Sequence, residues 1–293
     1  MRRRFVETVE SLMAGDERVV VLLGDIGVHS FRQAFARHPG RIHNLGICEQ
    51  SMIGVAAGMA KEGFIPIVHS IAPFVVERCY EQLKVDFAYQ ALGGNIVSVG
   101  ASYDYAMLGA THHCPADVAV LRAIPGVEVV VPGTPQEFEA LFRASYDDGH
   151  LTYFRLSECS HDRTANVRWG KATRMQQGAA ATVLSVGPTL GAVMAAVAGL
   201  DVEVLYYTTL APFDSEALRS GAASRKVVVV EPFYRGSLAA DVCESFPGQG
   251  IDTTWLGVPR EFVRQYGSRE DHDRLSGLTP EAIRSAVLEM IHA

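Results

Sequence analysis

One carboxylate, that of Glu49, stands where a short apolar segment gives way to a helical pattern, in the sequence His43-Asn44-Leu45-Gly46-Ile47-Cys48-Glu49-Gln50. Apolar residues then recur at helical spacing, at Met52, Val55, Ala56 and Met59. This pattern predicts that Glu49 lies in the first turn of a helix, near its buried end. A glutamate at such a place is ordinarily a surface charge that complements the helix dipole. In apolar surroundings its carboxyl group can instead keep a proton and share it with a weakly basic ring.

Three other residue types with chemical capability follow along the chain. Phe74 lies four residues before Arg78 and offers either an ordinary core ring or a face for stacking. His112 follows Thr111, and its imidazole either hydrogen-bonds its own loop or exchanges protons with a ligand near neutral pH. Arg155 ends an expected strand, and its guanidinium suits a phosphate or a carboxylate. Whether these side chains act together depends on the fold that positions them.

Residue spacing and net charge argue against several other kinds of site. The loop Gly24–Ser30 follows a strand but lacks the glycine pattern and the lysine of nucleotide-phosphate loops. His113 and Cys114 are adjacent rather than one helical turn apart, which makes them weak metal ligands. The formal net charge of −7 argues against a general nucleic-acid surface.

Cysteine usage and hydropathy favour a cytoplasmic protein. The five cysteines have no paired CxxC spacing, so neither a disulfide framework nor a zinc knuckle is indicated. No segment approaches the roughly 18 apolar residues of a membrane span. The arginine-rich start continues into an amphipathic pattern instead of the apolar stretch of a secretory signal.

The length of 293 residues favours two α/β domains over one. In residues 1–160, short β-branched runs alternate with helical stretches, which predicts a doubly wound, mostly parallel sheet. The expected strands are Val19–Gly24, Arg41–Asn44, Ile65–Ser70, Asn95–Val99, Val127–Val131 and Thr152–Arg155. The expected helices are Glu49–Lys61, Pro73–Gln90, Asp117–Ala123 and Pro135–Asp147.

A polar stretch, residues 161–177, is expected to be a linker to a second, smaller α/β domain at residues 178–293. That domain is expected to end with a helix near Pro280–His292. Its other expected elements are Ala181–Val186, Pro188–Leu200, Val202–Tyr207, Ser215–Ser220, Lys226–Val230, Arg235–Ser245 and Thr253–Leu256.

The sequence from Gly46 to Lys84 resembles the pyrimidine-binding core of transketolases, 1-deoxyxylulose-5-phosphate synthases and 2-oxoacid dehydrogenase beta subunits. It is most similar to split transketolases, whose two halves are separate chains. The similarity continues at residues 109–113, 121–126, 131–135 and 153–155. Residues 210–214 and 231–237 resemble motifs of the transketolase C-terminal domain. The resemblance implies a thiamine-diphosphate pyrimidine-binding domain followed by a transketolase C-terminal-like domain.

The resemblance implies roles in cofactor binding for four residues. The family glutamate that matches Glu49 hydrogen-bonds the pyrimidine nitrogen of thiamine diphosphate and favours the ring form that activates the cofactor. Phe74 matches the aromatic residue that stacks on this ring, and Ile47 belongs to the same cofactor-contacting motif as Glu49. Arg78 is expected to support a neighbouring carboxylate or the partner subunit.

Four residues are expected near the substrate. His112 matches a family histidine that approaches the oxygens of the reacting carbon, and we assign catalytic roles to Glu49 and His112. Arg155 matches an arginine that binds the substrate phosphate. Asp25 and His29 lie in the loop that faces the substrate channel in relatives, although either is equally consistent with a plain turn residue.

Two departures from ordinary transketolases suggest a changed substrate. Leu108 stands where those enzymes carry an aspartate that contacts a sugar hydroxyl, and Gly100 stands where they carry a phosphate-contacting histidine. The activating residues remain while two polar contacts are missing. We therefore expect transfer of a two-carbon ketol unit with altered substrate specificity.

The motif that binds the cofactor's diphosphate through Mg²⁺ is missing, since neither Gly-Asp pair is followed by a second glycine: Gly15-Asp16 precedes Glu17, and Gly24-Asp25 precedes Ile26. We therefore expect no metal ligand on this chain and a partner subunit that binds the diphosphate and Mg²⁺. A heterotetramer with two copies of each chain follows by analogy. Alternatives are a beta subunit of a 2-oxoacid decarboxylase or dehydrogenase, a non-catalytic relative and, least favoured, a nucleotide-binding protein.

Overall fold

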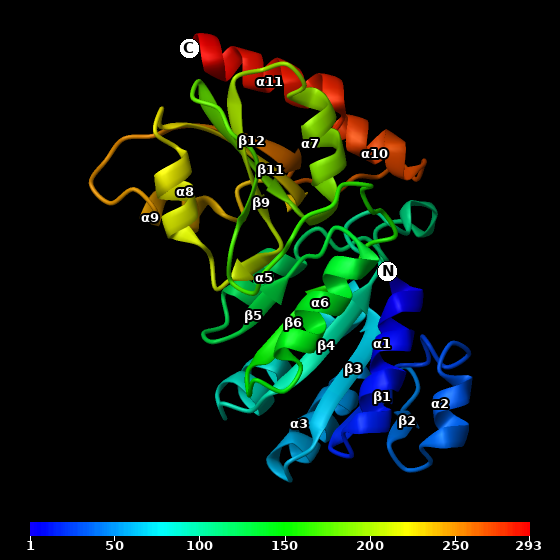
Figure 1. The fold of residues 1–293 in the computed structure, drawn as a ribbon. Helices are drawn as coiled ribbons and strands as arrows, with labels where there is room; N and C mark the ends of the chain where they lie inside the picture. Colours follow the sequence, from blue (N-terminus) through cyan, green and yellow to red (C-terminus); the bar gives the residue numbers. More distant parts are fainter.

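The computed structural model describes all 293 residues and contains two sheets, one above the other (Figure 1). The larger sheet has seven strands in the order β10-β5-β6-β4-β3-β1-β2, parallel except for β10, which runs antiparallel to β5. Its strands are β1 (Val19–Leu23), β2 (Ile42–Asn44), β3 (Ile65–Ile71), β4 (Gly94–Val99), β5 (Glu128–Val130), β6 (Leu151–Arg155) and β10 (Thr209–Ala211). All six strands expected in the first domain are confirmed.

Helices cover both faces of this sheet, which explains why its strands read as continuous apolar runs. In β1, Val20 and Leu22 pack with α3 (Glu49–Lys61) and α5 (Asp117–Arg122) in one core cluster. Val21 and Leu23 point to the opposite face, toward α1 (Arg2–Gly15) and α6 (Pro135–Ser145). Figure 1 shows α1 and α6 side by side on that face. A short helix, α2 (Arg32–Arg37), lies at the edge beside β2.

The segment expected as one helix, Pro73–Gln90, is instead a series of three short turns. Two wider π-helical turns, η1 (Pro73–Glu77) and η2 (Leu83–Ala88), flank the short helix α4 (Tyr80–Gln82). Such widened turns are rare and occur frequently at functional sites. Here the first of them carries Phe74 and is followed immediately by Arg78.

The second sheet has five strands in the order β12-β11-β8-β9-β7, with β7 antiparallel to β9. Its strands are β7 (Thr173–Gln176), β8 (Ala181–Val186), β9 (Val202–Tyr207), β11 (Lys226–Tyr234) and β12 (Asp252–Val258). Its helices are α7 (Leu190–Ala196), α8 (Ser215–Gly221), α9 (Ala239–Glu244), α10 (Arg269–Leu275) and α11 (Pro280–His292). The expected closing helix is thereby confirmed. No helix in the structure has the length and apolar character needed to cross a membrane.

Several elements lie outside the sequence-based expectation, among them the helices α1, α2 and α10 and the strands β7 and β10. Strand β7 falls inside the expected linker and forms a polar edge of the second sheet. Strand β10 follows β9 of the second sheet but pairs with β5 of the first, with Thr209 opposite Val130. The helix α10 was not expected. The domain limits 1–160 and 178–293 remain a prediction, and β10 shows that the chain returns to the first sheet after leaving it.

The parallel strands place their following loops at one edge of the seven-stranded sheet, the edge that faces the second domain (Figure 1). In doubly wound folds, ligands bind at this carboxyl edge of the strands. The loops after β1, β2, β3 and β4 carry almost all of the residues that the sequence singled out.

Candidate active site

Glu49 is the first residue of α3, as expected, and only 1% of it is exposed to solvent. Both carboxylate oxygens accept a hydrogen bond from within the chain. The Ser70 hydroxyl, from the end of β3, donates to Oε1 at 3.0 Å, and Arg78 Nη1 donates to Oε2 at 2.6 Å. Gly24, which follows β1, completes this pocket because a Cβ atom there would lie 3.3 Å from Glu49 Oε1. The carboxylate is therefore fixed in place by three different elements.

An aromatic ring and an imidazole lie next to this pair. The Arg78 guanidinium carbon lies 4.4 Å from the centre of the Phe74 ring, within cation–π distance. The rings of Phe74 and His112 meet edge to face, with centres 5.3 Å apart. The structure thus brings together four residues that the sequence predicted as site residues, namely Glu49, Phe74, Arg78 and His112.

His112 lies at the end of a turn that follows η3 (Ala106–Leu108). Its Nδ1 atom lies 2.9 Å from the Thr111 hydroxyl, and the side chain is partly exposed. The next residue, His113, is buried, and burial lowers the pKa of its imidazole, so His113 favours the neutral form. The turn therefore presents His112, and not His113, toward Phe74.

Three further predicted residues lie at the same edge without touching Glu49. Ile47 precedes α3 and is 68% exposed, which leaves its side chain free to contact a ligand. Asp25 is exposed with a left-handed backbone (φ 67°), and its backbone N–H donates to Asn44 Oδ1 at 2.9 Å. His29 is exposed, and its carbonyl accepts a hydrogen bond from Arg32. Their roles remain predictions.

Arg155 is placed differently from the expectation that it binds a substrate phosphate. Only 1% of this residue is exposed, and its Nε atom donates to Asp117 Oδ2 at 2.7 Å. A buried carboxylate already balances the charge of the guanidinium, and the side chain is not open to a ligand in this structure. We therefore assign Arg155 no direct contact with substrate.

Ser70 is a site residue that the sequence interpretation missed. It lies in β3, where every other residue is also buried, and its hydroxyl fixes one oxygen of Glu49. The sequence does contain a signal for this role, because His69 and Ser70 are polar residues within an otherwise apolar strand. A polar side chain in a buried strand needs a hydrogen-bond partner, and the partner of Ser70 is Glu49.

A group of potential metal ligands, Glu128, Asp148 and His150, lies at the opposite edge of the sheet, where β5 and β6 begin. Two of the three are exposed and the third is partly so. Because it lies at the opposite edge of the sheet, the group is not part of the candidate active site around Glu49.

Family models match nearly the whole chain. The pyrimidine-binding domain of transketolase matches residues 1–161, and the transketolase C-terminal domain matches residues 170–283. The chain belongs to the transketolase family. The site described above lies entirely within the pyrimidine-binding part.

Within the transketolase family, the chain is similar over nearly its full length to relatives of comparable size. It is 40% identical to an uncharacterized 33.6 kDa protein in the fasciation locus of Rhodococcoides fascians, over 97% of this chain and 92% of that protein. It is 30% identical to one of the subunits of the apulose-4-phosphate transketolase of Phocaeicola vulgatus, over 99% of this chain and 97% of that protein. The fold matches a split-gene transketolase described as an inactive beta4 tetramer, with a TM-score of 0.88 at 24% identity, over 99% of this chain and 98% of that one.

Proposed function

We propose that this chain is the pyrimidine-binding subunit of a two-component, thiamine-diphosphate-dependent transketolase. The enzyme transfers a two-carbon ketol unit from a ketose-like donor to an aldehyde-like acceptor. The observation that carries the proposal is the grouping of Glu49, Arg78, Phe74 and His112 at the carboxyl edge of the sheet. A site that had lost its chemistry would have no physical reason to keep a buried carboxylate beside a partly exposed imidazole.

The chain's residues fit the aminopyrimidine part of thiamine diphosphate. Glu49 supplies a buried carboxylate, Phe74 supplies a partly exposed ring, and Gly24 leaves space that a side chain would fill. When bound, the cofactor supplies a nucleophilic carbon and an electron sink. Glu49 then holds or releases a proton at the pyrimidine nitrogen, while Ser70 and Arg78 keep its two oxygens oriented.

His112 is proposed to handle protons on the substrate. Its ring stands edge to face with Phe74, so it lies beside the surface on which the cofactor ring would stack. An imidazole in this place can give a proton to a carbonyl oxygen of the substrate and take it back in the next step. Ile47, Asp25 and His29 line the approach from the exposed side.

A partner subunit is proposed to hold the diphosphate and Mg²⁺. The chain has no Gly-Asp-Gly motif, and the group Glu128, Asp148 and His150 lies at the far edge of the sheet. The Phocaeicola vulgatus relative is by its name one part of a transketolase with more than one kind of chain. We propose the same division here, with two copies of each chain in a heterotetramer.

The substrate is proposed to differ from that of ordinary transketolases. Leu108 is 52% exposed near the His112 turn and offers no hydrogen bond to a sugar hydroxyl. At Gly100 (φ 78°), a Cβ atom would lie 2.7 Å from the Tyr105 ring, so this ring fills the place of any larger side chain. Neither position therefore offers a polar side chain to the substrate. This absence favours a donor or acceptor with fewer hydroxyl groups.

Calorimetric titration of thiamine diphosphate with Mg²⁺ tests this proposal. We expect binding to the complex with a diphosphate-binding partner chain and no tight binding to this chain alone. The variant Glu49→Gln is expected to lose catalysis in the complex, by about 100-fold or more, because it can no longer exchange a proton with the ring.

Tight binding by the isolated chain would contradict the two-subunit proposal, and failure of the complex to bind would favour a non-catalytic relative. Release of carbon dioxide from a 2-oxoacid by the complex would overturn the proposed reaction and favour a decarboxylase.

A further inference from the structure

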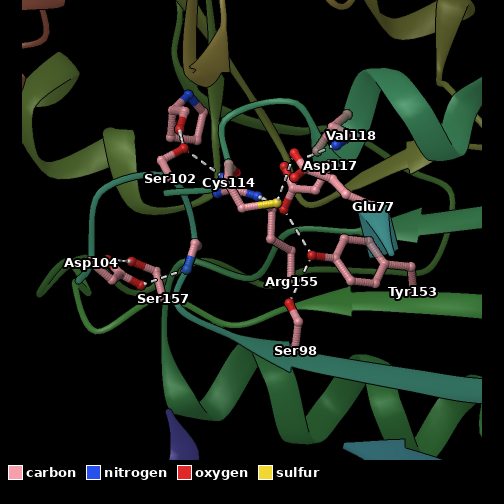
Figure 2. Close-up of polar contacts among 12 residues, drawn as sticks. Glu77, Ser98, Ser102, Asp104, Cys114, Asp117, Val118, Tyr153, Arg155 and Ser157 are labelled. Carbon is pink, nitrogen blue, oxygen red and sulfur yellow. Dashed lines mark hydrogen bonds and ion pairs between the residues drawn. The ribbon is translucent and has the colours of Figure 1, made fainter. Parts of the chain in front are cut away.

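A group of enclosed polar side chains lies between the seven-stranded sheet and the loop that carries His112 (Figure 2). Its centre is the ion pair of Arg155 and Asp117, in which Nε donates to Oδ2 at 2.7 Å. The Tyr153 hydroxyl donates to the same oxygen at 2.8 Å and lies 2.7 Å from the Ser98 hydroxyl. These four residues are 1% exposed or less, so the pair is anchored to β4, β6 and the start of α5.

A second nitrogen of the Arg155 guanidinium binds the loop that carries His112. Its Nη2 atom donates to the Ser102 hydroxyl at 2.6 Å and to the Cys114 carbonyl at 3.4 Å. Ser102 and Cys114 are themselves paired by backbone hydrogen bonds, at 3.3 Å and 2.9 Å, and this bridge closes the loop. His112 lies two residues before the closing point. One guanidinium therefore ties both ends of the loop to the sheet.

The second domain contacts the same closing point through three consecutive residues of β11. The Ser102 hydroxyl donates to the Pro232 carbonyl, and the Tyr234 backbone N–H donates to the Pro115 carbonyl at 3.0 Å. Between them, the Phe233 ring lies 5.6 Å from the Arg155 guanidinium carbon. The loop is thus held between the two domains.

We infer that Arg155 is a positioning residue for His112. By fixing Ser102 and Cys114 together, it sets the place of the imidazole against Phe74, and β11 of the second domain completes this hold. The inference rests on the proposed role of His112. The planar guanidinium can serve Asp117, Ser102 and Cys114 at once, whereas a lysine ammonium is a single point charge on a flexible stem. A role in stability alone would require only the pair with Asp117.

The substitution Arg155→Lys tests this inference in the full chain, because lysine keeps the charge beside Asp117 and loses the fork. We expect the ¹⁵N and ¹H resonances of the His112 ring, identified by their loss in His112→Gln, to shift or broaden in selectively labelled protein. In the complex with the partner subunit, kcat is expected to fall about 10-fold to 100-fold with KM little changed, as for a misplaced catalytic group.

Arg122→Lys is the matched control. Arg122 also joins the two domains, through the Leu210 carbonyl and Asp241, but contacts neither end of the loop. This control is expected to leave the His112 resonances and kcat unchanged. If the two substitutions have the same effect on both readouts, a general loosening of the domains explains the result and the inference is wrong.

Ser102→Ala keeps the inference testable if Arg155→Lys does not fold. It leaves the ion pair of Arg155 and Asp117 intact and removes the hydroxyl through which Arg155 binds the start of the loop. Unchanged His112 resonances in this folded variant would overturn the inference. The resonances are measured without substrate, so they decide this question even if the complex shows no transketolase activity, a result that would count against the proposed function alone.

Discussion

At the scale of single residues, the site depends on how one buried carboxylate is kept in place. Glu49 has a hydrogen-bond donor on each oxygen, Ser70 from strand β3 and Arg78 from the residue after η1. The position of Glu49, Phe74 and His112 was predictable because their residue types and spacing are visible in the chain. The partner Ser70 was not recognised, and Arg155 was assigned to substrate, because a sequence does not show which polar groups the fold encloses.

The substitution Ser70→Ala is expected to weaken both stability and cofactor binding. It leaves Glu49 Oε1 buried without a donor, and such a loss costs about 1 to 3 kcal/mol in the free energy of unfolding. Cofactor affinity of the complex is expected to fall as the carboxylate loses its orientation. Denaturant unfolding and calorimetry measure the two effects, with the exposed Ser220→Ala as the control. Equal behaviour of the two variants would show that Ser70 does not orient Glu49.

At the scale of elements, long periodic segments were predictable and short ones were not. The helix Glu49–Lys61 is confirmed with its expected bounds, since its apolar spacing extends over 13 residues. Strand β10, with three residues, is too short for any pattern, and its partner strand lies about 80 residues earlier in the chain. The expected helix Pro73–Gln90 has a helical apolar pattern, but that pattern does not distinguish an α-helix from a series of wider turns.

The turn before His112 depends on Gly109, which has a backbone that side-chain-bearing residues rarely adopt (φ 74°, ψ −168°). A Cβ atom there would lie 2.8 Å from the ring of Tyr266, a residue of the second domain. Gly109→Ala is therefore expected to reduce stability by about 1 to 3 kcal/mol and to lower kcat of the complex by moving the His112 turn.

Gly126→Ala provides the matched control for this prediction. Gly126 also has a positive φ (78°), but nothing lies within 4 Å of the added atom. We expect it to lose stability through the backbone alone and to keep its kcat. Steady-state kinetics and denaturant unfolding of both variants separate backbone strain from displacement of the turn, and an unchanged kcat in Gly109→Ala would argue against this role of the turn.

At the scale of the whole molecule, the two sheets form one structure because a single apolar cluster includes residues of both, and polar residues between them are also paired. The sequence indicated two α/β domains and the fold class, but it did not indicate that β11 supports the His112 loop. Contacts such as those of Pro232 and Tyr234 with the loop involve backbone atoms, which leave no residue-type signal. The sequence interpretation assigned no site residue to the second domain, whereas the structure places β11 against the loop that carries His112.

Glu231, the residue before this contact, gives the whole molecule a predictable dependence on pH. Its side chain is fully buried and accepts hydrogen bonds from the backbone N–H groups of Gly236 and Leu238 at 2.8 and 3.2 Å. Burial raises the pKa of this carboxyl to about 8, from 4.5, although the backbone N–H groups oppose the shift. The folded state therefore keeps a proton that the unfolded state releases, so this residue's contribution to stability is full below about pH 4.5 and is lost as the pH rises through 8.

The substitution Glu231→Gln removes this titration, while its amide can still accept one backbone hydrogen bond. We expect the free energy of unfolding of the natural chain to fall between pH 5 and pH 8 with a contribution of up to about 1.4 kcal/mol per pH unit from Glu231. The variant is expected to show a flatter profile by that amount, whereas the exposed Glu62→Gln is expected to follow the natural chain. Denaturant unfolding at half-unit pH intervals gives these profiles. Parallel profiles for Glu231→Gln and the natural chain would mean that the buried carboxyl is ionised in the folded protein, and the support that β11 gives to the His112 loop would then include a buried negative charge.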